Sequence, residues 1–150
     1  MNLLKDYKTK NNDQSDFSFY DYQGDSNLII LFFRGAWCNY CKKQLQEIQK
    51  NISELENLNF KIISISSDSK MNSSILKTFL KLSFPVLSDS DFKIINDYNL
   101  KVKYKAKEVS KPAIFIYNKK HEEIFNVIGD TYEDRLSAEA LLKTINNLSL

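Results

Sequence analysis

The sequence predicts an α/β fold in which a mixed central β-sheet is flanked by helices on both faces. Strand-length apolar segments alternate with amphipathic helical segments, which gives two βαβ-like crossovers in the first part of the chain. Two further strands then follow as a hairpin, and a helix is the last predicted element. Crossovers join parallel strands and hairpins join antiparallel ones, so we expect a mixed sheet.

The first predicted elements form the centre of this sheet. Residues 16–23 alternate aromatic and polar side chains, which indicates a short strand ending before Gly24. Residues 27–33 contain an unbroken apolar run, as expected of a central strand covered on both faces. From Cys41 to Leu55 apolar residues recur at intervals of four and three, which indicates one amphipathic helix of about four turns.

The remaining elements alternate in the same way. Residues 84–87 are interrupted by Pro85 and predict only a brief strand or extended segment, while residues 100–111 show no clear period. The other predicted elements are a strand (60–66), a helix (75–82), a short helix (92–98), a hairpin (112–117 and 122–128) and a final helix (137–148).

Composition points to one globular domain without a strong electrostatic preference. The 150 residues include 43% apolar and 27% charged residues, and the net charge is +2. Neither nucleic acid nor a membrane is therefore an expected partner. The longest apolar runs are too short to span a bilayer, and the polar N-terminal residues carry no signal-peptide core. We expect a cytoplasmic protein with a loose arm over residues 1–15 and one domain over residues 16–150.

The only two cysteines, Cys38 and Cys41, lie where a buried strand meets an amphipathic helix. At a helix N-terminus, unpaired N–H groups and the helix dipole stabilise a thiolate. Such a setting lowers a thiol pKa from about 8.5 to between about 3.5 and 7.5. Cys41 is in phase with Leu45 and Ile48 and should face the core, whereas Cys38 precedes that stripe and should face solvent. This pairing suits a dithiol–disulfide cycle.

Two other interpretations of the pair compete with this one. A structural zinc site needs four ligands, and the chain offers no further cysteine and only His121, which lies in a predicted turn where we expect it to be solvated. Two unreactive core thiols are the second alternative, because cysteine is often buried. The strand-to-helix context favours redox chemistry, with no metal and no cofactor.

Four segments of the chain carry a family resemblance. They are residues 33–41, which hold a Trp-Cys-x-x-Cys motif, and residues 63–68, 84–89 and 111–115. Through them, the sequence resembles the thioredoxin superfamily over about residues 17–148. In particular, it resembles the peroxiredoxin-like branch with an alkyl hydroperoxide reductase/thiol-specific antioxidant domain. The resemblance implies a thioredoxin-like fold and an antioxidant oxidoreductase acting in cell redox homeostasis.

The sequence departs from both parent motifs. Aligned on Cys41, it has Arg34 where peroxiredoxins have a proline and Cys38 where they have a threonine; their usual active-site arginine falls at Pro112. Compared with thioredoxins, Phe32 takes the position of the buried acid. Arg34 is therefore the nearby cation that could stabilise a thiolate or a bound peroxide oxygen; the alternative is a strand-end charge that reaches water.

Two further residues are expected to support the site. Trp37 should cover the cysteines and shape the docking surface. The resemblance places Pro112 against the cysteine turn and predicts a cis peptide bond before it. A basic stretch over residues 101–111 could meet an acidic partner or nucleic acid, but with a net charge of only +2 we expect a solvated surface.

Two substrate classes stay open. In the first, a hydroperoxide oxidises one thiolate to a sulfenic acid, and the second cysteine condenses with it. In the second, Cys38 attacks a protein disulfide, and Cys41 resolves the mixed disulfide. Either cycle needs a thiol electron donor such as thioredoxin or glutathione. A non-enzymatic binding module with the same fold is the alternative of another class.

The two family alignments nominate different nucleophiles, Cys41 for peroxiredoxins and Cys38 for thioredoxins. We predict that iodoacetamide alkylates Cys38 first at mildly acidic pH, because Cys38 precedes the helix and meets its unpaired N–H groups. Mass-spectrometric mapping of the singly labelled protein measures this, and preferential labelling of Cys41 would show that the peroxiredoxin alignment is the correct one.

Overall fold

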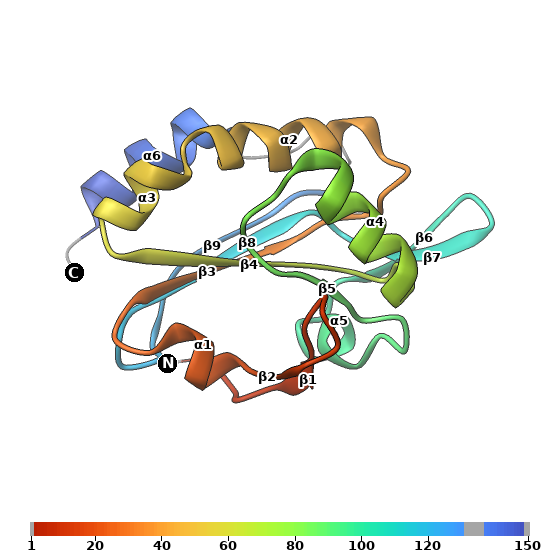
Figure 1. Ribbon diagram of the computed structural model, residues 1–150, viewed down its shortest axis with the longest axis horizontal. Coiled ribbons are helices and arrows are strands. Elements are labelled where there is room, and N and C mark those ends of the chain that lie inside the picture. The colour runs from red at the N-terminus through yellow and green to blue at the C-terminus, as the bar shows by residue number, and fades with distance from the viewer. Residues whose placement is uncertain (1, 131–136, 149–150) are drawn as a thin grey trace.

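The computed structural model describes residues 2–130 and 137–148. A five-stranded mixed sheet in the order β5-β4-β3-β8-β9 forms its centre (Figure 1). These strands are β3 (Asn27–Phe32), β4 (Phe60–Ser66), β5 (Val86–Ser88), β8 (Ala113–Tyr117) and β9 (Glu123–Ile128). Strand β3 pairs in parallel with β4 and antiparallel with β8, and β4 pairs in parallel with β5. The predicted mixed sheet is confirmed.

Helices cover both faces of the sheet. One face carries α2 (Asn39–Lys50), α3 (Ile52–Asn57), α4 (Lys70–Leu80) and α6 (Ala138–Asn147), and the other carries α1 (Phe19–Gln23) and α5 (Lys93–Asp97) (Figure 1). Two small antiparallel sheets lie outside the central one: β1 (Lys8–Lys10) with β2 (Asp16–Ser18), and β6 (Lys101–Tyr104) with β7 (Lys107–Ser110).

Strand β3 separates two hydrophobic cores. All six of its residues are buried, as the apolar run predicts. Ile29 and Leu31 face the core shared with α2, α3, α4 and α6, and Leu28 and Ile30 face the core shared with α1 and α5. Because both faces are covered, a one-residue change of register would exchange these two sets between the cores and disrupt the packing of both.

The helix predicted to run from Cys41 to Leu55 is interrupted. It ends at Lys50, and α3 begins at Ile52 after Asn51. The side chain of Asn51 donates a hydrogen bond to the carbonyl of Glu47 over 2.8 Å. This local bond competes with the helical backbone pattern, which the apolar spacing alone does not reveal.

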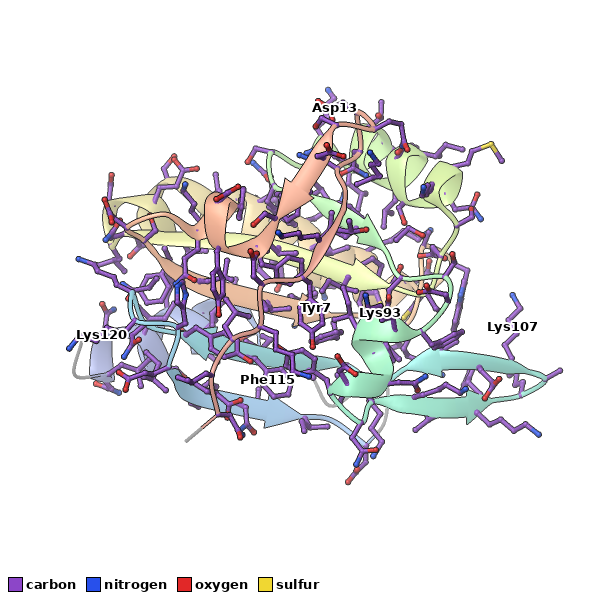
Figure 2. All side chains as sticks on the ribbon, turned by 90° about the horizontal axis from the view of Figure 1, so that it is seen from below. Tyr7, Asp13, Lys93, Lys107, Phe115 and Lys120 are labelled. Atoms are coloured by element: carbon purple, nitrogen blue, oxygen red, sulfur yellow. The ribbon has the colours of Figure 1, made fainter. Side chains whose placement is uncertain are left out.

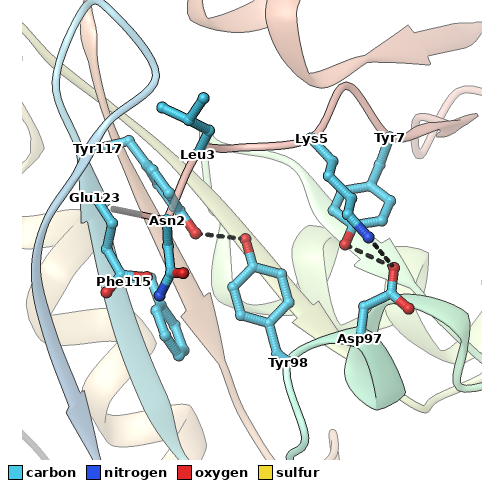
Figure 3. A pocket seen from close by; sticks show the side chains of 9 residues that line it. All are labelled: Asn2, Leu3, Lys5, Tyr7, Asp97, Tyr98, Phe115, Tyr117 and Glu123. Atoms are coloured by element: carbon cyan, nitrogen blue, oxygen red, sulfur yellow. Dashed lines mark hydrogen bonds and ion pairs between the residues drawn. The ribbon is translucent and has the colours of Figure 1, made fainter.

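The expectation of a loose N-terminal arm is wrong for the described residues 2–15. Strand β1 pairs with β2, and the side chains of Leu4 and Tyr7 are buried in the core beside α5. The Tyr7 hydroxyl donates to Asp97 over 2.8 Å, and the ammonium of Lys5 lies 3.6 Å from the same carboxylate (Figure 3). Frequent lysine and asparagine residues conceal these two buried side chains in the sequence.

Other segments also differ from the sequence prediction. The strand expected over residues 16–23 ends at Ser18, whose side chain caps α1 by accepting the N–H of Asp21. Residues 101–110, which lack a clear period, form the β6–β7 hairpin with Val102 opposite Val109. His121 is packed rather than solvated, because its ring stacks on Tyr20 with centroids 3.9 Å apart.

Several predicted elements are confirmed. Strand β4 has the predicted bounds, and β8 and β9 form the predicted hairpin. The final helix begins after Ser137, whose hydroxyl accepts the N–H of Ala140 over 3.1 Å. Among the described residues, no helix is both long enough and apolar enough to cross a bilayer.

A buried carboxylate, Asp89, fixes the start of α5. It is 4% exposed and accepts the N–H groups of Ile94 and Ile95 over 3.1 and 2.7 Å. Burial raises the pKa of Asp89 from 3.8 to about 6, although the two N–H groups act in the opposite direction. The folded state therefore holds a proton there between about pH 4 and 6 that the unfolded chain has released.

We predict that Asp89 makes folding less favourable as the pH rises from about 4 to 6. Asp89→Asn removes this titration. The free energy of unfolding of the wild type minus that of the variant should fall across this window and stay level outside it. Urea denaturation at a series of pH values measures the difference, and parallel curves for the two proteins would contradict the prediction.

Candidate active site

Residues 33–38 form the loop that leaves the carboxyl end of β3 and leads into α2; we call it the cysteine loop. The strands β3, β4 and β5 are parallel, so their carboxyl ends lie along the same edge of the sheet. The N–H of Phe33 still binds the carbonyl of Ile65 in β4, and the N–H of Cys38 closes a turn onto Gly35. The loop is thereby held at both ends.

The sulfur of Cys38 caps helix α2. Cys38 has an extended backbone, and its Sγ accepts the N–H of Cys41 over 3.4 Å. This is the contact that the position of the cysteine pair predicts. An N–H group and the positive end of a 12-residue helix both favour negative charge on the sulfur.

Both cysteines are buried. Cys41 is 0% exposed and packs with Leu45 in the core below α2, as its helical phase predicts. Cys38 is only 5% exposed, so the expectation that it faces solvent is wrong. The turn from Gly35 to Cys38 places this sulfur in the same core as Phe33, an effect of tertiary folding that helical phase does not include.

Arg34 does not reach into water. It is 6% exposed, and its guanidinium carbon lies 3.6 Å from the centre of the Tyr104 ring and 5.4 Å from that of Trp37. The rings of Trp37 and Tyr104 stack at 5.5 Å with an angle of 13° between their planes. This arrangement contradicts the alternative in which the strand-end charge of Arg34 reaches water, and it places that charge near the ring of Trp37, the residue before Cys38.

Trp37 folds back over the cysteine loop. A Cβ atom on Gly35 would lie 2.3 Å from the indole Nε1 of Trp37, so only glycine leaves room for the ring there. The indole remains 42% exposed. It therefore covers the loop from outside while presenting a part of its surface to the surroundings.

The carboxylate of Asp68 fixes the loop from the neighbouring strand. Its Oδ2 accepts the N–H of Ala36 over 2.8 Å and the hydroxyl of Ser66 over 2.7 Å. Burial raises the pKa of Asp68, and these two hydrogen bonds oppose that effect. In the sequence, residues 63–68 indicate only a family resemblance. The convergence of parallel strand ends is the signal that could have placed Asp68 next to the loop.

Pro112 is buried and borders a cavity of about 350 Å³ together with Arg34 and Tyr104. No peptide bond is cis among the described residues, so the expected cis bond before Pro112 is wrong. The chain runs extended between β7 and β8: the N–H of Lys111 binds the carbonyl of Leu100, and the carbonyl of Pro112 accepts the N–H of Gly129. The trans peptide bond before Pro112 keeps this segment extended.

The site offers two thiols, one of them held at a helix N-terminus. It also holds a buried guanidinium in the same loop, packed against Tyr104. In the part of the chain that the structure describes, no three His, Cys, Asp or Glu side chains are grouped to hold a metal ion.

Residues 2–122 match the sequence profile of the AhpC/TSA family. The chain belongs to the AhpC/TSA family. This AhpC/TSA protein is 26% identical over 111 residues to sporulation thiol-disulfide oxidoreductase A of Bacillus subtilis, covering 71% of this chain and 62% of that protein. It is 26% identical over 84 residues to alkyl hydroperoxide reductase E of Mycobacterium tuberculosis, covering 56% and 55% of the two chains. It thus spans about three fifths or less of these curated relatives.

Solved structures confirm the fold expected of an AhpC/TSA protein. The peroxidoxin BcpB of Mycobacterium tuberculosis superposes with a TM-score of 0.87 at 15% identity, over 99% of this chain and 97% of that one. A cysteine-to-serine mutant of PrxQ from Xylella fastidiosa gives 0.81 at 14% identity, over 97% and 96%. The predicted thioredoxin-like fold of the peroxiredoxin branch is therefore correct.

We predict that Asp68→Ala lowers the free energy of unfolding by about 1–3 kcal/mol, because the N–H of Ala36 and the hydroxyl of Ser66 lose their acceptor. It should also speed alkylation of Cys38 by loosening the loop. Asp68→Asn keeps one acceptor oxygen and should lose less stability. Urea unfolding and timed iodoacetamide labelling measure both effects, with Asp25→Ala, at an exposed aspartate, as control. Equal losses in Asp68→Ala and Asp25→Ala would contradict the assignment.

Proposed function

We propose that this AhpC/TSA protein is a peroxiredoxin-like peroxidase that reduces hydroperoxides through a Cys38/Cys41 dithiol–disulfide cycle. The observation that carries the proposal is the Cys38 sulfur at the N-terminus of α2, 3.4 Å from the N–H of Cys41. A nucleophilic cysteine must react as a thiolate, and this contact favours that form.

The first step oxidises Cys38. Its thiolate attacks one oxygen of the hydroperoxide, so that a sulfur–oxygen bond forms while the oxygen–oxygen bond breaks. The other oxygen leaves with a proton as an alcohol, or as water when the substrate is hydrogen peroxide. Cys38 becomes a sulfenic acid, and the peroxide gains the two electrons.

The second step closes a disulfide. The thiol of Cys41 attacks the sulfenic sulfur of Cys38, a sulfur–sulfur bond forms, and the hydroxyl leaves as water with the proton of Cys41. The two cysteines are the cap and the third residue of the same helix, so little rearrangement is needed. A thiol donor such as thioredoxin or glutathione then returns two electrons and two protons, in keeping with a reducing cytoplasm.

Arg34 supplies positive charge in this proposal. Its guanidinium packs against the Tyr104 ring and is nearly inaccessible to water, in an environment where a charge acts more strongly than at the surface. It would stabilise the thiolate or the oxygen that becomes negative as the peroxide bond breaks. Trp37 covers the loop, and Pro112 borders the cavity next to Arg34.

Burial of both sulfurs supports a small substrate. Cys38 is 5% exposed, and a folded protein carrying a disulfide would have to displace the loop around Trp37 to reach it. A hydroperoxide needs much less space. With both cysteines reduced, accessibility therefore favours a hydroperoxide over a folded protein as the substrate that oxidises them.

A thioredoxin-type protein disulfide oxidoreductase is the second candidate. The Trp-Cys-x-x-Cys motif at the start of a helix supports it, and so does the similarity to the thiol-disulfide oxidoreductase of Bacillus subtilis. In that case Cys38 attacks a substrate disulfide, and Cys41 displaces the reduced substrate from the mixed disulfide.

We predict that the reduced protein reacts with hydrogen peroxide orders of magnitude faster than cysteine in solution does. Rapid quenching with an alkylating agent followed by mass spectrometry measures the rate and the product. Cys38→Ser should abolish the fast phase, whereas Cys41→Ser should keep it and accumulate a sulfenic acid on Cys38. A peroxide rate equal to that of cysteine, together with reduction of insulin, would establish the disulfide oxidoreductase instead. Full biological activity of the double serine variant would indicate a binding module.

A further inference from the structure

The β6–β7 hairpin carries a concentration of positively charged side chains that the proposed chemistry does not use. It projects beyond the end of the central sheet as a separate two-stranded ribbon (Figure 1). Residues 101–111 contain five lysines and a single acidic residue, Glu108, although the whole chain has a net charge of only +2. The basic character of the chain is thus local to this element.

Two of the five lysines form ion pairs with the described residues, and three do not. Lys101 lies 3.4 Å from Glu108, and Lys111 lies 3.9 Å from Asp130. Lys103, Lys105 and Lys107 are exposed, and among residues 2–130 and 137–148 no carboxylate lies within ion-pair distance of them. Figure 2 shows Lys107 reaching away from the hairpin. We call these three residues the lysine cluster.

The lysine cluster is joined to the cysteine loop through aromatic contacts. Tyr104, in the hairpin, stacks on Trp37, the residue before Cys38. The ammonium nitrogen of Lys107 lies 5.8 Å from the centre of the Trp37 ring, and that of Lys105 lies 5.3 Å from the Tyr104 ring. A molecule that contacts the cluster therefore lies against Trp37, the residue that covers the cysteine loop, and a protein bound there is placed to displace this cover from the sulfurs.

We propose that the lysine cluster is the docking surface for an acidic dithiol protein that reduces the Cys38–Cys41 disulfide. This inference rests on the proposed function. A thiolate of the partner attacks one sulfur of the disulfide to form a mixed disulfide, and the partner's second thiol displaces this chain as a dithiol. Two electrons and two protons pass to this chain, and the partner leaves as a disulfide.

The charge arrangement favours such a partner over the other ligands of this site. A hydroperoxide is small and reaches the sulfurs without a docking surface, whereas a protein donor must be oriented and steered. The three ammonium groups, which form no ion pair with the described residues, repel one another, and acidic side chains of a partner relieve that repulsion. Nucleic acid binding would use open aromatic faces for stacking on bases. Here the Tyr104 ring already packs against Arg34 and Trp37.

The test compares two variants with the same change in charge. Lys105→Glu/Lys107→Glu alters the cluster, and Lys119→Glu/Lys120→Glu alters two exposed lysines in the turn between β8 and β9. Figure 2 shows Lys107 and Lys120 at opposite ends of the molecule. Each variant is oxidised with peroxide, and its second-order rate of reduction is measured with a thioredoxin of net negative charge. The uncharged reductant dithiothreitol serves as the reference.

At low ionic strength we expect the cluster variant to react about tenfold or more slowly with thioredoxin, because electrostatic steering changes association rates by about 10–10³. The difference should shrink in about 0.5 M salt, the control variant should stay within about twofold of the wild type, and dithiothreitol should reduce all three proteins equally.

Other results would overturn the proposal. They are an equal slowing in the control variant, no slowing in the cluster variant, or slowing with dithiothreitol as well. The wild type could instead bind a single-stranded oligonucleotide more tightly than it binds thioredoxin, in a salt-sensitive way that the cluster variant loses. That result would assign the cluster to nucleic acid. A chain that forms no Cys38–Cys41 disulfide with peroxide would overturn the proposed function itself, whereas normal cycling with dithiothreitol but no cluster effect overturns the docking surface alone.

Discussion

Parallel pairing of β3 with β4, and of β4 with β5, gathers three carboxyl strand ends on one edge of the sheet. The site depends on this constraint. Since β3 is buried along its whole length, it cannot shift, and the cysteine loop that follows it has a fixed origin. The loop after β4 then supplies Asp68, which binds Ala36, and the segment after β5 supplies Asp89, which holds α5. Loops on a rigid sheet edge can hold reactive groups in place without needing regular structure of their own.

Backbone and aromatic groups contribute directly to the electrostatics of the site. The Cys38 sulfur meets an N–H at the start of α2, and the Arg34 guanidinium rests on the Tyr104 ring instead of in water. Both arrangements act in a nearly dry environment, where partial charges interact more strongly. They also make the chemistry depend on Gly35, because a larger residue there would displace the indole of Trp37 that stacks on Tyr104.

Local patterns in the sequence were enough to predict the fold class, the bounds of β4 and the placement of the cysteine pair at the start of α2. These features follow from hydrophobic period and helix termini, which act over a few residues. The features that sequence reasoning missed depend on contacts between distant segments. The turn onto Gly35 buries Cys38, the core beside α5 takes in Leu4 and Tyr7, and the bonds of Lys111 and Pro112 to other segments keep that stretch extended. A single sequence shows neither the partner nor the geometry of such contacts.

The position of Trp37 also gives the molecule an optical reporter. It is the only tryptophan in the 150 residues, and it directly precedes Cys38 in the sequence while stacking on Tyr104 of the hairpin. Light absorbed at wavelengths selective for indole is therefore emitted from the cysteine loop alone. Each oxidation state of the neighbouring sulfurs, and each molecule that settles on the hairpin, changes the surroundings of this one ring. The unmodified chain can thus be followed through its cycle without an attached dye.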